Sequence, residues 1–272
     1  MLVATHRSRG RAAAETTLIA PALLLPEVLG LVERACTVVM NHYGSDVAVA
    51  LKGDKSPVTA ADEAAEAVLL AGLQALTPEV PVIAEEQVAA GQAPESVGTR
   101  FWLVDPLDGT KEFISQNGEF TVNVALVDAG QPILGVVAAP AIDTYWWGAL
   151  GHGAVMRTAG TTRSIEARAL PAGGPVAMVS RSHGSPDEEA FLAEQGTASR
   201  SPAGSSLKFC RIAEGVADLY PRFGRTMEWD TAAAHAVLQA AGGKVTTRDG
   251  TPLRYGKPDF ANDGGFVAQG RG

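Results

Sequence analysis

The feature that most constrains the fold of this chain is an apolar stretch that runs directly into two aspartates. Phe101–Val104 has the composition of a buried strand, and DPLDGT at 105–110 follows it without a break. Pro106 and Gly109 favour a tight turn, which is predicted to fold both carboxylates toward one point at the end of a sheet. Anions held this close repel each other unless a cation lies between them, and Mg²⁺ accepts carboxylate, water and phosphate oxygens. The hexapeptide therefore predicts a magnesium site.

The spacing of the two aspartates excludes two other kinds of acidic loop. An EF-hand calcium loop needs a glutamate at its twelfth position, where this chain has Gln116. A loop that forms an aspartyl-phosphate needs acids two positions apart, and Asp105 and Asp108 are three apart. The remaining alternative to a metal site is a plain turn whose aspartates accept hydrogen bonds from the backbone.

Acidic residues also stand at the boundaries of two other predicted elements. The predicted strand Val80–Ala84 runs into Glu85 and Glu86, and it can lie beside Phe101–Val104, so that both strands end in carboxylates. A solvated acidic pair is the alternative interpretation. Asp230 begins a predicted helix, where its alternative role is that of an N-cap.

The pattern of apolar residues divides the chain into two differently organised parts. Helices followed by paired strands, an α+β pattern, are predicted at 26–42, 59–76, 120–127, 133–139, 144–149 and 154–157. Strands alternating with helices, an α/β pattern, are predicted at 176–180, 187–195, 206–215, 217–220, 231–241 and 244–247. We expect a poorly ordered or over-extended segment at 1–25, an α+β domain with the metal site at 26–157, and a smaller α/β domain at 158–272. A polar loop is expected at 87–100.

Composition narrows the class of partner. The 272 residues carry a formal charge of −8, which argues against binding nucleic acid through a basic face but permits a small anionic ligand beside local cations. Cys36 and Cys210 are too few for a disulfide framework, as in a cytoplasmic protein. No apolar stretch is long enough to cross a bilayer, and Pro21 interrupts the stretch Leu18–Leu25 that imitates a signal peptide. We therefore expect a cytoplasmic protein without an integral membrane segment.

The motifs taken together resemble those of the inositol monophosphatase family. The shared motifs, in matching order and spacing from about residue 26, are Glu85-Glu86, DPLDGT at 105–110, WDTAAAH at 229–235 and AGG at 241–243. Five segments are similar to the CysQ-type 3'(2'),5'-bisphosphate nucleotidases within that family: 56–62, 105–126, 180–183, 204–210 and 219–224. Lys111 and Glu112 stand where an inositol monophosphatase typically has Thr-Asn. The resemblance implies a layered αβαβα sandwich, combining α+β and α/β parts, with the active site between its two halves.

The resemblance also implies a role for each acidic residue. The implied ligands of two or three Mg²⁺ ions are Glu85, Asp105, the carbonyl oxygen of Leu107, Asp108 and Asp230. Asp105 would bridge two ions, and Glu85 would also act in catalysis. Thr110 resembles the hydroxyl that orients the attacking water, and Asp62 the acid that accepts a hydrogen bond from it. Asp62 also matches a helix capping box with Thr59, which is its alternative interpretation.

Substrate recognition is expected to combine these acids with nearby cations and backbone donors. The expected substrate-binding residues are Glu85, Leu107, Asp108, Gly109, Thr110, Ser205, Ser206, Lys208, Arg222 and Asp230. Lys208 and Arg222 are the first candidates for a second phosphate, with Arg225, Arg181 and His183 behind them. A solvated surface charge is the alternative for each basic residue.

The activity implied by the resemblance is Mg²⁺-dependent hydrolysis of adenosine 3',5'-bisphosphate to AMP and phosphate, without a phospho-enzyme. It also implies action on the 3'-phosphorylated sulfate donor of sulfur assimilation, and inhibition by Li⁺. The same chemistry on inositol monophosphate or fructose 1,6-bisphosphate is the nearest alternative, and a non-catalytic metal- or nucleotide-binding regulator is the second. A homodimer and a position on the cytoplasmic face of the inner membrane stay open.

Overall fold

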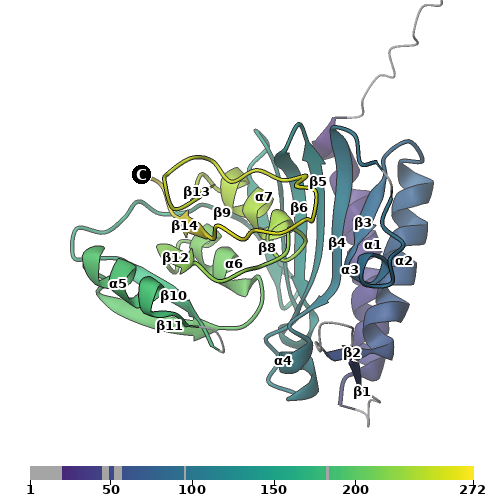
Figure 1. Ribbon diagram of the computed structural model, residues 1–272, viewed down its shortest axis with the longest axis horizontal. Coiled ribbons are helices and arrows are strands. Elements are labelled where there is room, and N and C mark those ends of the chain that lie inside the picture. Colours follow the sequence, from purple (N-terminus) through teal and green to yellow (C-terminus); the bar gives the residue numbers. More distant parts are fainter. Residues whose placement is uncertain (1–19, 45–48, 52–56, 95, 182–183) are drawn as a thin grey trace, which may run out of the picture.

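The chain folds into five stacked layers of helices and sheets. The computed structural model describes residues 20–44, 49–51, 57–94, 96–181 and 184–272. Figure 1 shows α1 and α2, a seven-stranded sheet, α6 and α7, a five-stranded sheet and α5 in succession across the molecule. Separate clusters of buried apolar side chains fill the spaces between these layers. This confirms the predicted αβαβα sandwich.

The larger sheet forms the centre of the first half of the chain. Its strands, in order across the sheet, are β3 (Val82–Ala84), β4 (Arg100–Asp108), β5 (Thr121–Asp128), β6 (Gln131–Ala139), β7 (Thr144–Ala149), β8 (Ala154–Thr158) and β9 (Thr161–Ile165). The β3–β4 pair is parallel and the others are antiparallel. Helices cover both faces of the sheet, which explains why β4 is apolar almost throughout rather than alternating.

Two long helices cover one face of this sheet. They are α1 (Pro21–His42) and α2 (Ala60–Leu76), whose buried side chains form one cluster with those of β4, β5 and β6. The apolar positions of α1 recur at helical spacing, and its first residue is a proline, which an N-terminal helical position tolerates. In the part of the chain that the structure describes, no helix combines the length and the apolar content needed to cross a membrane.

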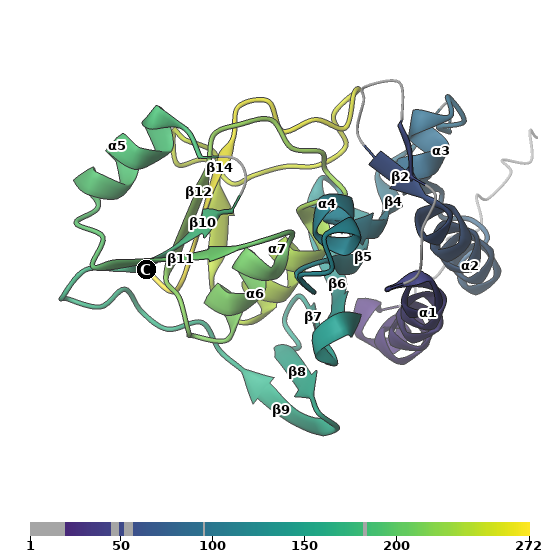
Figure 2. The same ribbon diagram turned by 90° about the horizontal axis from the view of Figure 1, so that it is seen from below.

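The smaller sheet and its helices form the second half of the chain. Its strands, in order, are β11 (Ser199–Ala203), β10 (Val176–Ser180), β12 (Leu219–Arg222), β14 (Phe266–Gln269) and β13 (Lys244–Thr246). The helices α6 (Leu207–Ala213) and α7 (Ala232–Ala240) lie between the two sheets, and α5 (Pro186–Glu194) covers the outer face. Figure 2 shows α6 and α7 between the sheets and α5 at the far side from α1 and α2.

The two halves approach each other closely where β6 meets α7. A Cβ atom at Gly135 of β6 would lie only 2.1 Å from the carbonyl oxygen of Ala233 in α7. Real Cβ atoms do not come this close to backbone atoms, so only glycine fits there. This contact fixes the distance between the larger sheet and the helix that begins beside Asp230.

The short elements lie around the edges of the sandwich. They are β1 (Val49–Leu51), β2 (Pro57–Thr59), α3 (Glu85–Ala89), α4 (Thr110–Ile114) and the 3₁₀ turn η1 (Pro140–Ile142). β1 and β2 pair in an antiparallel ladder, and α3 and α4 each follow the end of a strand of the larger sheet. Both of these short helices therefore begin at the edge where the predicted acidic residues lie.

Three expectations from the sequence were wrong in detail. The first helix begins at Pro21 rather than near residue 26, so 21–25, expected to be poorly ordered, are helical, and Leu24 is buried. Residues 1–19 lie outside the described residues. The segment 105–108 is no turn but the end of β4, which continues past a register shift against β5. Part of the loop expected at 87–100 is α3, because its apolar Val88 packs against the core.

The strands that the sequence did not predict are short or exposed. β9 pairs with β8 in the larger sheet, beyond the boundary expected at residue 157, although four of its five residues are exposed. β11 is an edge strand, where the ladder tolerates its Pro202. The division into domains 26–157 and 158–272 remains a prediction. β9 belongs to the larger sheet although it follows residue 157, so the sheets do not divide at that boundary.

Candidate active site

A cavity of about 450 Å³ lies between the two halves of the sandwich. Its walls come from the start of α3, the end of β4 with the turn into α4, the turn before α6, the end of β12 and the start of α7. Of the predicted residues, those that line it are Glu85, Asp108, Gly109, Thr110, Ser205, Lys208, Arg222 and Asp230. Arg225, a further candidate, and Arg181, a second-line candidate, line it as well. His183 lies outside the described residues.

Four predicted residues lie behind the cavity wall instead: Asp62, Asp105, Leu107 and Ser206. The Asp105 side chain is only 1% exposed, and its carboxylate accepts a hydrogen bond from the backbone N–H of Leu107 at 3.0 Å. The Leu107 side chain belongs to the core below α1 and α2. Ser206 is buried, and its backbone N–H donates to Asp108 Oδ2 at 2.7 Å while its hydroxyl bonds with Thr121 and Asn123. Ser206 therefore supports Asp108 rather than facing a ligand.

Asp62 uses its two carboxylate oxygens for two different partners. Oδ2 accepts hydrogen bonds from the backbone N–H and the hydroxyl of Thr59, at 2.9 and 2.7 Å, which completes the capping box of α2. Oδ1 accepts a hydrogen bond from the hydroxyl of Thr110 at 3.4 Å. The capping role and the contact with Thr110, which the sequence offered as alternatives, are both present.

Thr110 is placed by the backbone turn before it. Gly109 has a positive φ of 91°, a conformation that glycine adopts easily, and this turn ends β4 and begins α4. The Thr110 hydroxyl lies 3.3 Å from the Leu107 carbonyl oxygen as well as within reach of Asp62. Its single proton goes to one of these acceptors at a time, and its lone pairs stay available to a donor in the cavity.

Four carboxylates line the cavity. Three of them, Glu85, Asp108 and Asp230, come from distant parts of the chain, and the fourth, Glu112, lies in α4 shortly after Asp108. Burial, opposed by the charge of Lys208 and assisted by that of Glu85, raises the pKa of Asp108 to about 7. Burial, Asp108 and Glu85 together raise the pKa of Asp230 well above its usual value. The acids are therefore close enough to repel one another.

This donor set fits a hard divalent cation. Carboxylate oxygens are the ligands that Mg²⁺ prefers, and a cation among the three acids would remove their mutual repulsion. One Asp230 oxygen is oriented by the backbone N–H of Met227 at 2.8 Å, and one Asp108 oxygen by Ser206. Within the described residues, no three histidine, cysteine, aspartate or glutamate side chains are already gathered tightly enough to enclose an ion. The acids share one wall of the cavity without forming a closed cage.

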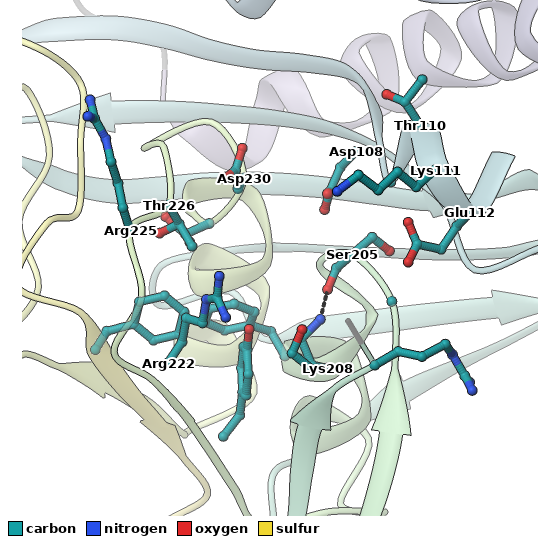
Figure 3. Close-up of a pocket in the computed structure, with 18 of the residues that line it drawn as sticks. Asp108, Thr110, Lys111, Glu112, Ser205, Lys208, Arg222, Arg225, Thr226 and Asp230 are labelled. Atoms are coloured by element: carbon teal, nitrogen blue, oxygen red, sulfur yellow. Dashed lines mark hydrogen bonds between the residues drawn. The ribbon is translucent and has the colours of Figure 1, made fainter. Parts of the chain in front are cut away.

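The opposite wall of the cavity carries positive charge. Lys208 is only 4% exposed, and its ammonium group donates to the carbonyl oxygens of Ser205 at 2.5 Å and Ala203 at 3.3 Å. Burial lowers the pKa of Lys208 to about 8, and the Asp108 charge opposes this shift. Arg222 lies 3.9 Å from Glu188, and Arg225 pairs with two exposed aspartates at the rim. Figure 3 shows Lys208 and Arg222 below the acids, with the Lys208–Ser205 hydrogen bond.

Sequence reasoning missed the residue that holds the turn before α6. The Glu119 carboxylate accepts hydrogen bonds from Arg181 at 2.6 and 3.0 Å and from the backbone N–H of Gly204 at 2.8 Å. Its carbonyl oxygen accepts a further bond from the Ser205 hydroxyl at 3.0 Å. Arg181 is thus tied to Glu119 at the cavity rim. The signal was the position of Glu119 inside the segment 105–126, which carries the resemblance.

A buried polar chain supports the start of α7 from behind. His235 Nδ1 is hydrogen bonded to the Tyr255 hydroxyl at 2.9 Å, and that hydroxyl donates to Thr231 Oγ1 at 3.3 Å. Burial lowers the pKa of His235 to about 3, and Arg254 adds to this effect. The imidazole is therefore neutral at ordinary pH. The hydrogen-bonded series of side chains ends at Thr231, next to Asp230.

Comparison with known proteins agrees with this fold and site. The family model described as "Inositol monophosphatase family" matches residues 24–270. The fold and the acidic cavity define a family of phosphatases, and the chain belongs to the inositol monophosphatase family.

Its relatives within that family include nucleotidases. The chain is 46% identical over 244 residues to "3'(2'),5'-bisphosphate nucleotidase CysQ" of Escherichia coli (strain K12), covering 89% of this chain and 98% of that protein. The protein of the same name from Buchnera aphidicola is 39% identical over 90% of this chain and 93% of its own length. The solved structure of CysQ from Bacteroides thetaiotaomicron has a TM-score of 0.77 and 33% identity, covering 94% of this chain and 100% of that one.

Proposed function

We propose that this protein hydrolyses the 3'-phosphate of adenosine 3',5'-bisphosphate to give AMP and inorganic phosphate. The observation that carries the proposal is one cavity that joins three carboxylates on one wall to buried and half-buried cations on the other. A nucleoside bisphosphate needs both, because one phosphate reacts while the second is only bound. The relatives that align with 89% and 90% of this chain are named as 3'(2'),5'-bisphosphate nucleotidases.

Thr110 and Asp62 orient the attacking water in the proposed reaction. The Thr110 hydroxyl donates its proton to Asp62 Oδ1, which leaves an oxygen lone pair to accept a hydrogen bond from water. Asp62 cannot rotate away, because Thr59 holds its other oxygen. The water oxygen attacks phosphorus directly, and the bond from phosphorus to O3' breaks with its electron pair passing to O3'. The proton that the water gives up balances the one that O3' takes up, so AMP and phosphate are the products. No phospho-enzyme forms in this scheme.

The backbone N–H groups of Gly109 and Thr110 are proposed to bind the reacting phosphate, since both residues line the cavity at the turn into α4. Glu85, Asp108 and Asp230 would hold Mg²⁺, with Asp105 and the Leu107 carbonyl oxygen as further proposed ligands. Bound Mg²⁺ supplies charge neutralisation on the phosphoryl oxygens and lowers the pKa of water. The proposed number of bound Mg²⁺ ions is two or three.

Lys208 and Arg222 are proposed to bind the second phosphate. Both line the cavity, and both have lost most of their contact with water, so an anion beside them is stabilised more than one at an exposed lysine. Lys208→Ala should lower kcat/KM for adenosine 3',5'-bisphosphate far more than for adenosine 3'-monophosphate. An equal loss on both substrates would remove this selectivity role.

The rest of the proposal follows from the same resemblance. It includes the sulfated 3'-phosphonucleotide as a second substrate, inhibition by Li⁺, a cytoplasmic location and a link to sulfur assimilation. A homodimer and attachment to the inner face of the membrane stay as open alternatives. The nearest rival substrates are inositol monophosphate and fructose 1,6-bisphosphate.

The deciding experiment measures phosphate release from four substrates in the presence of Mg²⁺. They are adenosine 3',5'-bisphosphate, AMP, inositol 1-phosphate and fructose 1,6-bisphosphate. We expect the first to have the highest kcat/KM, and hydrolysis in ¹⁸O-water to place the label in phosphate. Preference for a sugar monophosphate would refute the proposed substrate, label in the nucleoside would refute attack at phosphorus, and no phosphate release from any of them would favour a binding protein.

A further inference from the structure

Glu112 is a carboxylate in the cavity wall that the proposed mechanism does not use. It lies in α4, two residues after Thr110, and is half-buried at the cavity surface. Among the residues that the structure describes, its carboxylate has no hydrogen-bond or ion-pair partner, unlike Glu119. Figure 3 shows it beside Ser205, which lies between Asp108 and Lys208 in that view.

Two glycines, one from each half of the molecule, leave the space that Glu112 occupies. A Cβ atom at Gly109 would lie 3.3 Å from Glu112 Oε2, and one at Gly204 would lie 3.0 Å from Glu112 Cγ. The Gly109 turn is the proposed site of the reacting phosphate, and the Gly204 turn leads to Lys208. Glu112 therefore lies between the proposed positions of the two phosphates.

An unpaired carboxylate at this place is unfavourable for an anionic ligand unless the ligand offers it a hydrogen-bond donor. Its charge acts on Asp108 and on Lys208, so it lies within electrostatic reach of both ends of the cavity. Phosphate groups without protons have only acceptor oxygens. The group that joins the two phosphates of a nucleoside 3',5'-bisphosphate is the ribose, and its free 2'-hydroxyl is a donor.

We propose that Glu112 determines specificity by accepting a hydrogen bond from the ribose hydroxyl next to the reacting phosphate. The inference rests on the proposed function and adds to it that this enzyme selects ribonucleotides over deoxyribonucleotides. A buried hydrogen bond to a charged group discriminates against an analogue that lacks the donor, because the acceptor is then left desolvated and unpaired. The expected selectivity is about 10- to 100-fold in kcat/KM.

The test compares adenosine 3',5'-bisphosphate with its 2'-deoxy analogue on the wild-type enzyme and on Glu112→Ala and Glu112→Gln. The wild type should prefer the ribonucleotide by about 10- to 100-fold. Glu112→Ala should bring the two substrates to nearly equal kcat/KM. Glu112→Gln keeps an acceptor oxygen without the charge, so its preference should be intermediate. Glu63→Ala removes one exposed carboxylate from α2, outside the cavity, and should keep the wild-type ratio.

The ratio of the two substrates separates this role from a structural one. If Glu112 only balanced the charge of Lys208, Glu112→Ala would change both substrates by the same factor and the inference would be wrong. A wild type with no preference for the ribonucleotide would also overturn it, while leaving the proposed function intact. Failure of the wild type to hydrolyse either nucleotide would overturn the proposed function itself.

Discussion

The divided use of the Asp62 carboxylate predicts that its two roles can be separated by two substitutions. Thr59→Ala removes the hydroxyl that caps α2 through Ala61 at 3.2 Å, but it leaves the 3.4 Å contact from Thr110 to Asp62 Oδ1 in place. Loss of such a cap costs about 1 kcal/mol of stability, or about 2–4 °C in Tm. We expect kcat to stay within about threefold of the wild type, because Thr59→Ala leaves the contact between Thr110 and Asp62 in place. Loss of a positioned catalytic acid or base would lower kcat much more, by about 10²–10⁴-fold.

Asp62→Ala removes both roles at once. The Thr59 N–H and hydroxyl lose their buried acceptor, which costs about 1–3 kcal/mol. The Thr110 hydroxyl also loses the acceptor that fixes its proton, so kcat should fall by about 10²–10⁴-fold.

The assay pairs thermal unfolding with initial rates of phosphate release from adenosine 3',5'-bisphosphate at a temperature well below both melting transitions. If both variants are destabilised but only Asp62→Ala loses kcat, the two oxygens of Asp62 have separate roles in capping and in catalysis. If Thr59→Ala lost as much kcat as Asp62→Ala, or if Asp62→Ala kept its kcat, the reasoning from the two oxygens would be refuted.

Two further predictions concern stability. Gly135→Ala should destabilise the fold by about 3 kcal/mol or more in urea unfolding, because its Cβ would meet the Ala233 carbonyl oxygen at 2.1 Å. Gly30→Ala in α1, where an added Cβ would meet only the Arg34 side chain at 3.6 Å, should instead stabilise the fold by about 0.5–1 kcal/mol. Similar effects at both sites would contradict the close approach at Gly135. The pKa of His235 is lowered from 6.5 to about 3 on folding, so its neutral form contributes stability that is complete above pH 6.5 and is lost as the pH falls toward 3. From pH 8 to pH 5 the wild type should therefore lose about 2 kcal/mol more than His235→Gln in urea unfolding, whereas parallel pH profiles would contradict the shift.

The sequence predicted the layers and most helices and strands, because burial on one face leaves a visible period. The apolar spacing in α1 and the hairpin of β5 and β6 were found in this way. The apolar spacing placed the start of α1 too late, near residue 26, whereas the helix begins at Pro21 and contains Pro26. Local propensity cannot choose between two permitted starts, and the packing of Leu24 decides it.

Strands defined by their partners rather than by their own pattern were missed. β9 has mostly exposed polar residues and exists because β8 pairs with it, and β14 is only four residues long between β12 and β13. For the same reason 105–108 was expected to be a turn: Pro106 favours one locally, but pairing of Asp108 with Thr121 extends β4 past the irregularity.

The acidic residues of the candidate site could be identified from motifs, but their individual positions could not. Glu85, Asp108 and Asp230 line the cavity as expected, whereas Asp105 lies behind its wall. Ser206 and Asp108 are 98 residues apart in the chain, so no local pattern indicates their hydrogen bond. Such long-range contacts depend on how the two sheets meet across α6 and α7.

The most direct test of the account is a crystal structure grown with Mn²⁺ in place of Mg²⁺, with anomalous scattering data to locate the ions. We predict anomalous density between the carboxylates of Glu85, Asp108 and Asp230, at the edge of the cavity beside Thr110. Density only at other places on the surface, or none in the cavity at saturating Mn²⁺, would contradict the claim that these three acids share a divalent cation.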